Sequence, residues 1–484
     1  MTRREFPLTA LAAAVRAPGP LGVDIGSRRE LFVDHAILAS LQGAELRAAS
    51  PLDAGQALVL DRPWEGAFSA YTSVVAAGGR FRFYYRGNPR SGNDGNDNEV
   101  TCCAESADGV HWSRPELRLF PLPTAPVNNI VLAGQAPFSH NFSPFLDTRP
   151  GVPEGERFKA LAGIHKSGLW AFTSADGLRW KKVGAAPAVP SPKEFAFDSQ
   201  NVSFWSRHEG RYVLYFRTWK KIGAVDYRWI SRATSDDFLH WRTEGEIDFA
   251  GAPPEHLYTN QASPYFRAPH IITAICARFL PGRQVLSAQQ AASVGVDPKY
   301  YKDCSDAVFL SSRGGLRFDR TFLEAFLRPG HGWQNWVSRS NYPALNLIAT
   351  GPSTMSFFVN RNYGQPTAHL RRYELRLDGF ASLHAGYAGG QAVTHPLRFR
   401  GARLELNYAT SAAGSVRVEI QDATGRPLDG FRLEDSKELI GDETARAYAW
   451  QGGEDLSPLS GRPVRLRFLL KDADIYSFRF LPAV

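Results

Sequence analysis

Short runs of aromatic and β-branched residues recur along most of the chain, each bounded by glycine, proline or other turn residues. The clearest runs are residues 80–85, 157–161 and 211–216, and looser copies follow at 270–274 and 355–359. Ahead of each run lies another short apolar stretch that opens on polar residues. Apolar runs of about four to eight residues between turn signals predict β-strands rather than helices. The pattern therefore indicates an all-β protein.

A short motif also repeats along this part of the chain. It occurs, at steps of 68, 61 and 77 residues, as SADGVHW at 106–112, SADGLRW at 174–180, SDDFLHW at 235–241 and, weakened, SRGGLRF at 312–318. Asp-Gly and Asp-Asp pairs favour tight turns between strands, and the aromatic residue that follows packs beneath the turn. We therefore interpret Asp108, Asp176 and Asp237 as turn residues.

Five such units of about four strands each predict a five-bladed β-propeller over residues 30–390. The strand at 30–34, or its neighbour, is expected to close the ring by pairing with the last blade. A helical pattern at 287–294 predicts a loop insertion over the propeller mouth. After residue 389, polar and apolar residues alternate, which predicts antiparallel strands with one solvated face. We expect a C-terminal β-sandwich over residues 391–484.

The composition agrees with short strands and tight turns. The 484 residues include 43 Gly, 32 Pro and 12% aromatic residues, and the proportions of 43% hydrophobic and 21% charged residues exclude wholesale disorder. The formal net charge is +8, but basic residues are scattered singly among acidic ones, so we expect no nucleic-acid partner. No apolar run approaches the roughly 20 residues of a membrane-spanning helix, so we expect no membrane span.

The cysteines and the N-terminus bear on the location of the protein. The four cysteines have neither the number nor the spacing of a disulfide framework or a zinc site, so we expect buried thiols. They are Cys102, Cys103, Cys276 and Cys304. Residues 1–20 resemble a twin-arginine export signal, with two adjacent arginines before a weakly apolar stretch. This pattern predicts a periplasmic or secreted protein; the other interpretation is an ordinary N-terminal segment.

We expect the chemistry where the inner strands of the blades begin, because these starts converge on one central channel. The polar and aromatic residues at these starts are Glu65, His140, Asn141, Asp198, Gln200, Glu255, His256, Tyr258, Asn260, Trp336 and Arg339. Carboxylates from different blades suit glycosyl transfer, which needs one acid and one base or nucleophile. We predict Asp198, Glu255 and Glu65 as catalytic residues and the others as substrate-binding residues.

Each position also has a purely structural interpretation, in which the polar residue satisfies backbone groups in a water-filled channel. His140 and His256, together with Asp198 or Glu255, have the ligand types of a metal site, but no spacing demands one. We therefore predict no metal and no cofactor. Substrate is expected to bind through hydrogen bonds and through stacking on rim aromatics such as Trp336.

Several stretches resemble the five-bladed propeller glycosidases, the invertase/levanase and arabinanase/xylosidase superfamily, and in particular a bacterial branch similar to the N-terminal domain of glycosyl hydrolase family 32. The stretches are residues 30–34, 104–112, 197–202, 233–241, 255–260 and 473–478. The resemblance implies a propeller paired with a β-sandwich. The chain lacks the Trp-Met-Asn-Asp-Pro-Asn-Gly, Arg-Asp-Pro and Glu-Cys motifs that hold the catalytic residues of the invertase-like enzymes, so no catalytic residue is carried over.

The leading hypothesis is an exported glycoside hydrolase that cleaves an oligo- or polysaccharide with paired carboxylates in the central pocket. The second is a glycan lyase or phosphorylase on the same scaffold, with histidine and arginine neutralising a uronate or holding phosphate. The third is a non-catalytic carbohydrate-binding protein. Fold alone does not decide between them, and the sequence leaves the sugar, the linkage, the stereochemical outcome and the oligomeric state open.

Overall fold

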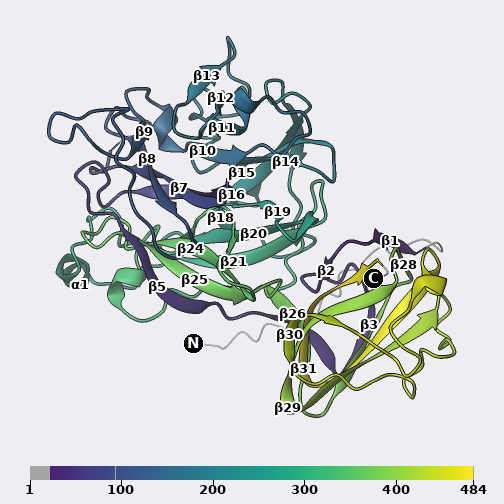
Figure 1. The fold of residues 1–484 in the computed structure, drawn as a ribbon. Helices are drawn as coiled ribbons and strands as arrows, with labels where there is room; N and C mark the ends of the chain where they lie inside the picture. Colours follow the sequence, from purple (N-terminus) through teal and green to yellow (C-terminus); the bar gives the residue numbers. More distant parts are fainter. Residues whose placement is uncertain (1–21, 93, 483–484) are drawn as a thin grey trace. The chain divides into compact units, whose positions relative to one another are not determined.

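The computed structural model describes residues 22–92 and 94–482, which form two compact units (Figure 1). One unit runs from residue 47 to residue 382, with residues 249–252 excepted, and the other holds that short segment and the described residues at both ends. The export signal predicted over residues 1–20 lies outside the described residues. No helix among the described residues is long and apolar enough to cross a membrane.

The first unit is a five-bladed β-propeller, as the sequence predicts, and each blade is a sheet of four or five strands. The first blade consists of β6 (Ala70–Ala77), β7 (Arg80–Gly87), β8 (Val100–Ser106) and β9 (Ile130–Leu132), and the second of β10 (Ser143–Leu146), β11 (Phe158–Ala162), β12 (Trp170–Ser174) and β13 (Lys181–Val183). The third blade consists of β14 (Val202–Ser206), β15 (Arg211–Ile222), β16 (Val225–Ser235) and β17 (Arg242–Glu246), and the fourth of β18 (His256–Thr259), β19 (Ser263–Tyr265), β20 (Ala268–Leu280) and β21 (Cys304–Ser312). The fifth blade consists of β22 (Tyr342–Pro343), β23 (Ile348–Ala349), β24 (Thr354–Arg361), β25 (His369–Arg376) and β5 (Leu52–Val59). Successive inner strands contact one another around the ring: β6 with β10, β10 with β14, β14 with β19, and β22 with β6.

The ring is closed by β5, which precedes the first blade in the sequence and pairs antiparallel with β25 of the last blade. The sequence suggests residues 30–34 or a neighbouring strand for this role, but the strand that closes the ring, β5, lies further along the chain, after β3 and β4. Glu30 and Leu31 form β2 (Glu30–Leu31), which pairs with the C-terminal strand of the second unit. The expected boundaries of 30–390 are therefore too wide, because residues 30–46 and 383–390 belong to the second unit.

The repeated motif forms the turn between the third and fourth strands of a blade. In the first copy, Asp108 Oδ1 accepts the backbone N–H groups of Val110 and His111, and Ser106 Oγ accepts that of Gly109. Trp112 then donates its indole N–H to the Gly109 carbonyl. Gly109 has φ +74°, the left-handed region that glycine enters without strain. The second and third copies repeat these contacts, so the interpretation of the motif aspartates as turn residues is confirmed.

The second unit is a ten-stranded sheet system built around two long strands, β29 (Arg403–Asp422) and β31 (Pro463–Leu481). Its other strands are β1 (Val23–Gly26), β2, β3 (Leu38–Gln42), β4 (Ala44–Ala48), β26 (Ala381–Ala385), β27 (Gly390–Thr394), β28 (Leu397–Phe399) and β30 (Asp442–Ala447). Alternate side chains of the long strands form one core with Phe32 and Trp450, which is the packing of a β-sandwich. The four C-terminal strands that the alternation predicts are halves of these two long strands.

The only α-helix among the described residues is α1 (Ala288–Ser293), where the sequence predicts a helical insertion. A capping box between Ser287 and Gln290 starts the helix. Short 3₁₀ turns lie at Phe138–His140, Glu154–Glu156, Trp333–Asn335 and Ser457–Leu459. The helix contacts the turn at 333–335, and Tyr300, in the segment that follows it, lines the cavity described below. All four cysteines are buried free thiols, as expected.

Candidate active site

A polar cavity of about 300 Å³ lies in the propeller where inner strands begin. Its lining consists of Tyr71, Arg86, Asn88, Ser91, Gly92, Asp94, Tyr258, Tyr300, Arg339 and Tyr363. These residues come from the first, fourth and fifth blades. The second and third blades add His140 and Asp198, which are grouped with Asp94, so all five blades contribute to one site.

The central feature of the site is a pair of carboxyl groups, Asp94 and Asp198. One oxygen of each lies within 4.8 Å of the other, and each influences the ionisation of the other. Burial raises the pKa of Asp198, and the charge of Asp94 raises it further against the opposing effect of Arg217. Burial also opposes ionisation of Asp94, but His140, Asp198 and Arg86 together lower the pKa of Asp94. Ionisation is therefore favoured at Asp94 and disfavoured at Asp198.

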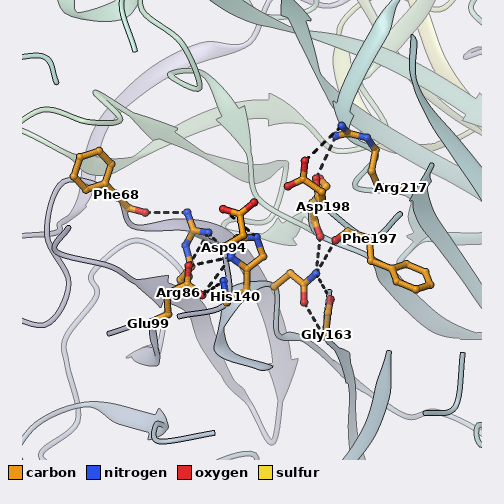
Figure 2. A network of polar contacts seen from close by, with 12 residues as sticks. Phe68, Arg86, Asp94, Glu99, His140, Gly163, Phe197, Asp198 and Arg217 are labelled. Carbon is orange, nitrogen blue, oxygen red and sulfur yellow. Dashed lines mark hydrogen bonds and ion pairs between the residues drawn. The ribbon is translucent and has the colours of Figure 1, made fainter. Parts of the chain in front are cut away.

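The backbone around Asp198 is held rigidly. The preceding residue, Phe197, has φ +67°, a strained conformation for a bulky side chain that persists only where its surroundings enforce it. The Asn141 side-chain amide supplies that constraint, because it donates to the carbonyl oxygens of Phe197, Ser199 and Gly163 at 2.8–3.0 Å. Figure 2 shows this network beside Asp198, with Arg217 approaching the carboxyl group from the other side. Arg217 Nη2 lies 3.9 Å from Asp198 Oδ2.

His140 lies next to the carboxyl pair and is oriented by Glu99. The Glu99 carboxylate lies 3.0 Å from His140 Nδ1. Arg86 Nη1 lies 3.0 Å from the same nitrogen and 3.6 Å from Glu99. The other ring nitrogen, Nε2, is buried without a hydrogen-bond partner among the described residues and lies 3.9 Å from Asp94 Oδ1. This nitrogen therefore faces the carboxyl pair (Figure 2).

Asp94, His140 and Asp198 are the three residue types that would hold a divalent cation here. One ligand atom from each lies within 4.8 Å of the others, and a carboxylate that orients a ligating histidine is the usual outer shell of such sites. The surrounding charge opposes a cation, however. Arg86 and Arg339 both act on Asp94, and Arg217 acts on Asp198. The local charges therefore favour a proton over a metal between the two carboxyl groups.

Four of the predicted site residues meet in this site, namely Asp198, His140, Tyr258 and Arg339. Three predicted amides instead have structural roles. Asn141 holds the Asp198 loop, Gln200 bonds Ser73 and Gln261 in the centre of the ring, and Asn260 bonds the Tyr215 carbonyl and the Ala262 amide.

Glu65 and Glu255, predicted as catalytic, do not line the cavity. The fully buried Glu65 carboxylate accepts from the Tyr85 hydroxyl at 2.6 Å and from Arg114 at 2.6 and 2.7 Å. Glu255 accepts from Arg278 at 2.8 Å and from Arg320 at 2.6 Å. Both carboxylates thus form ion pairs with arginines, and we interpret these ion pairs as structural.

Two further predicted binding residues lie beside the cavity rather than on its wall. His256 Nδ1 accepts the backbone N–H of Arg228, and burial together with Arg228 and Arg217 lowers the pKa of His256, which keeps the ring neutral. Trp336 donates its indole N–H to the Gly330 carbonyl at 2.9 Å.

Residue-type reasoning missed Asp94, Arg86 and Arg217. Asp94 lies in the polar, glycine-containing stretch 91–98, which reads as an ordinary loop. The two arginines carry a usable signal, because each follows an aromatic pair on the second strand of a blade, as Tyr84-Tyr85-Arg86 and Tyr215-Phe216-Arg217. A charged residue in a buried strand needs a polar partner, and here the polar groups of the site supply it.

No protein-family model matches the sequence, and no curated protein matches it. Among solved structures, a glycoside hydrolase aligns at 10% identity over 68% of this chain and 92% of its own, with a TM-score of 0.47. An N-acetylgalactosamine deacetylase from F. plautii aligns at 14% identity over 69% and 96%, with a TM-score of 0.43. An exo-inulinase from Aspergillus awamori aligns at 12% identity over 87% and 99%, with a TM-score of 0.36. At these identities the likeness concerns the fold alone.

Proposed function

We propose that this protein is a glycoside hydrolase that cleaves an oligo- or polysaccharide in the propeller cavity, with Asp94 and Asp198 as its catalytic pair. The observation that carries the proposal is the opposite shift of their two pKa values. One protonated and one ionised carboxyl group at the same site are the two components that glycosidic cleavage requires.

The roles of the pair follow from their protonation. Asp198 is the general acid that protonates the leaving oxygen, and Asp94 is the nucleophile at the anomeric carbon. Ligand oxygens of the two lie within 4.8 Å. Retaining glycosidases hold their carboxyl groups roughly 5–5.5 Å apart, whereas inverting enzymes hold them roughly 6.5–9.5 Å apart to admit a water. The short separation supports a retaining mechanism, which replaces the predicted pairing of Asp198 with Glu255.

His140 is proposed as a positioning residue in this mechanism. Its Nδ1 lies 3.0 Å from the Glu99 carboxylate and its Nε2 lies 3.9 Å from Asp94 Oδ1. From this position His140 lowers the pKa of Asp94 and favours its ionised form. The tyrosine hydroxyls on the wall supply donors for sugar hydroxyl groups.

The direct test is a screen of the purified protein against a panel of oligo- and polysaccharides, with a reducing-sugar readout and mass analysis of the products. We expect water to be added across the cleaved bond. Binding without any product after long incubation at high protein concentration would instead indicate a carbohydrate-binding protein.

A glycan lyase or phosphorylase is the second candidate, and the arginines of the cavity favour it. Arg339 lines the cavity, and guanidinium groups neutralise a uronate or hold phosphate. Products separate these activities, because a lyase leaves an unsaturated sugar and a phosphorylase requires phosphate.

Export by the twin-arginine route belongs to the same proposal, since a polysaccharide substrate lies outside the cytoplasm. The test is cell fractionation of the full chain beside a variant with Arg3→Lys and Arg4→Lys. We expect the variant to stay in the cytoplasm, and an unchanged distribution would contradict export by this route.

A further inference from the structure

Three arginine side chains surround the ring of Tyr258. The guanidinium carbons of Arg217, Arg228 and Arg339 lie 4.9, 5.4 and 5.4 Å from the centre of that ring. They come from β15, β16 and the segment before β22. All three also act electrostatically on the buried Tyr342 hydroxyl and oppose the rise in its pKa that burial causes. The three positive charges therefore share one small volume.

Few ion pairs balance this concentration of positive charge. In the part of the chain that the structure describes, Arg228 and Arg339 form no ion pair, and the nearest carboxylate to Arg217 is Asp198 at 3.9 Å. Arg217 is buried, and Arg228 and Arg339 are half-buried. Arginine almost never lies buried unless it is paired, and three adjacent guanidinium groups repel one another.

The hydrogen-bonding groups of these arginines are also incomplete. Nε and Nη2 of Arg217, and Nε of Arg228, are buried without an acceptor among the described residues. Arg217 itself is 1% exposed. The strained backbone of Arg339, with φ +58°, fixes the third guanidinium at the cavity wall. Strained backbone of this kind concentrates at ligand sites. Planar guanidinium groups with free N–H donors match the oxygens of a carboxylate.

We propose that Arg217, Arg228 and Arg339 form a subsite for the carboxylate of a uronic acid, so that the sugar in the catalytic subsite is acidic. The inference deepens the proposed function and rests on it for the position of the sugar, because Arg217 is the residue that approaches Asp198. A uronate carboxylate placed there supplies the missing acceptors and the missing negative charge.

Binding of monosaccharides tests the subsite directly. Ligand-observed NMR on the full chain would measure the affinities of D-galacturonic acid and D-glucuronic acid beside their neutral methyl esters. We expect at least one free acid to bind about tenfold or more tightly than its ester, as charge-assisted hydrogen bonds predict. Arg339→Gln is expected to abolish that preference. Arg90→Gln, an exposed arginine of the loop after β7, is the matched control and should keep the preference.

Each other outcome has a definite meaning. Equal binding of acid and ester, or a preference that survives in both Arg339→Gln and Arg228→Lys, would overturn the subsite. Tighter binding of inorganic phosphate or sulfate than of either uronate would overturn the carboxylate assignment and favour a phosphorylase. Monosaccharides contain no glycosidic bond, so the result is independent of catalysis. Uronate binding without turnover of any glycan would support the subsite and contradict the hydrolase. Cleavage of neutral glycans together with equal binding of acid and ester would support the hydrolase and contradict the subsite.

Discussion

Asp94 and Asp198 lie with ligand oxygens within 4.8 Å of one another although they come from different blades, Asp94 from the loop after β7 and Asp198 from the segment before β14. Their environments shift the two pKa values in opposite directions, as a general acid and a nucleophile require. Asp198 is half-buried beside Asp94, and desolvation together with the charge of Asp94 raises its pKa, whereas Asp94 faces His140 and Arg86, which lower its pKa. Asp198 is therefore the member of the pair that favours the protonated form, and Asp94 is the one that favours the ionised form.

The first prediction concerns stereochemistry. One oxygen of each carboxyl group lies within 4.8 Å of the other, whereas inverting enzymes hold the two groups roughly 6.5–9.5 Å apart to admit a water. We expect the first product to keep the anomeric configuration of the substrate. Proton NMR of the reaction mixture, recorded before mutarotation, measures this. A product of inverted configuration at the earliest time points would exclude Asp94 as a nucleophile.

The second prediction concerns pH. Activity requires Asp94 ionised and Asp198 protonated, so kcat/KM should rise as pH increases through the lowered pKa of Asp94 and fall as pH increases through the raised pKa of Asp198. The alkaline limb should lie above the ordinary aspartate value of 3.8. The measurement is a pH profile of kcat/KM, with circular dichroism at each pH to exclude unfolding. Activity that increases steadily into the alkaline range would be incompatible with Asp198 as the acid.

The third prediction separates structural from catalytic acids. Glu65→Gln removes the charge that pairs with Arg114 in a fully buried position, and breaking a buried pair on one side costs about 3 kcal/mol. We expect a loss of that size in the free energy of unfolding, measured with urea, and a nearly unchanged kcat in the folded fraction. Glu116→Gln, an exposed glutamate near Arg114, is the control. Loss of turnover in a Glu65→Gln protein of normal stability would restore Glu65 as a catalytic residue.

The fourth prediction concerns metal. Arg86, Arg217 and Arg339 act on the carboxyl pair, so a divalent cation would add positive charge to a site that already has an excess. We expect dialysis against EDTA to leave kcat/KM unchanged. If EDTA abolished activity and Mn²⁺ or Ca²⁺ restored it, then Asp94, His140 and Asp198 would be metal ligands rather than the acid and nucleophile.

The propeller was predictable because its signals are local. The motif at 106–112 and its later copies combine an aspartate that caps a turn with a tryptophan that packs under it, and both contacts lie within one hairpin. Ring closure was harder. Residues 52–59 and 369–376 pair across most of the sequence, and the alternation within 52–59 does not specify a partner.

The site was predictable only in part, for a related reason. Asp198 and His140 stand at strand starts, so their meeting follows from the topology of a propeller. Asp94 lies in a loop, and its position depends on how that loop folds back over the cavity. Glu255 has the same sequence context as Asp198, and it differs because two arginines reach it. Such partners come from residues distant in the sequence, so the local sequence around Glu255 does not predict them.

The most direct test of the account compares Asp94→Asn with Glu255→Gln on a glycan that the wild-type protein cleaves, by measuring kcat/KM for both variants. Removal of a catalytic carboxylate costs about 10²–10⁴-fold or more, so we expect a loss of at least that size for Asp94→Asn. Glu255→Gln should retain activity within about tenfold. Asp97→Asn, an exposed aspartate of the same loop, is the matched control for Asp94. Full activity of Asp94→Asn beside an inactive, folded Glu255→Gln would contradict the assignment of Asp94 and Asp198 as the catalytic pair.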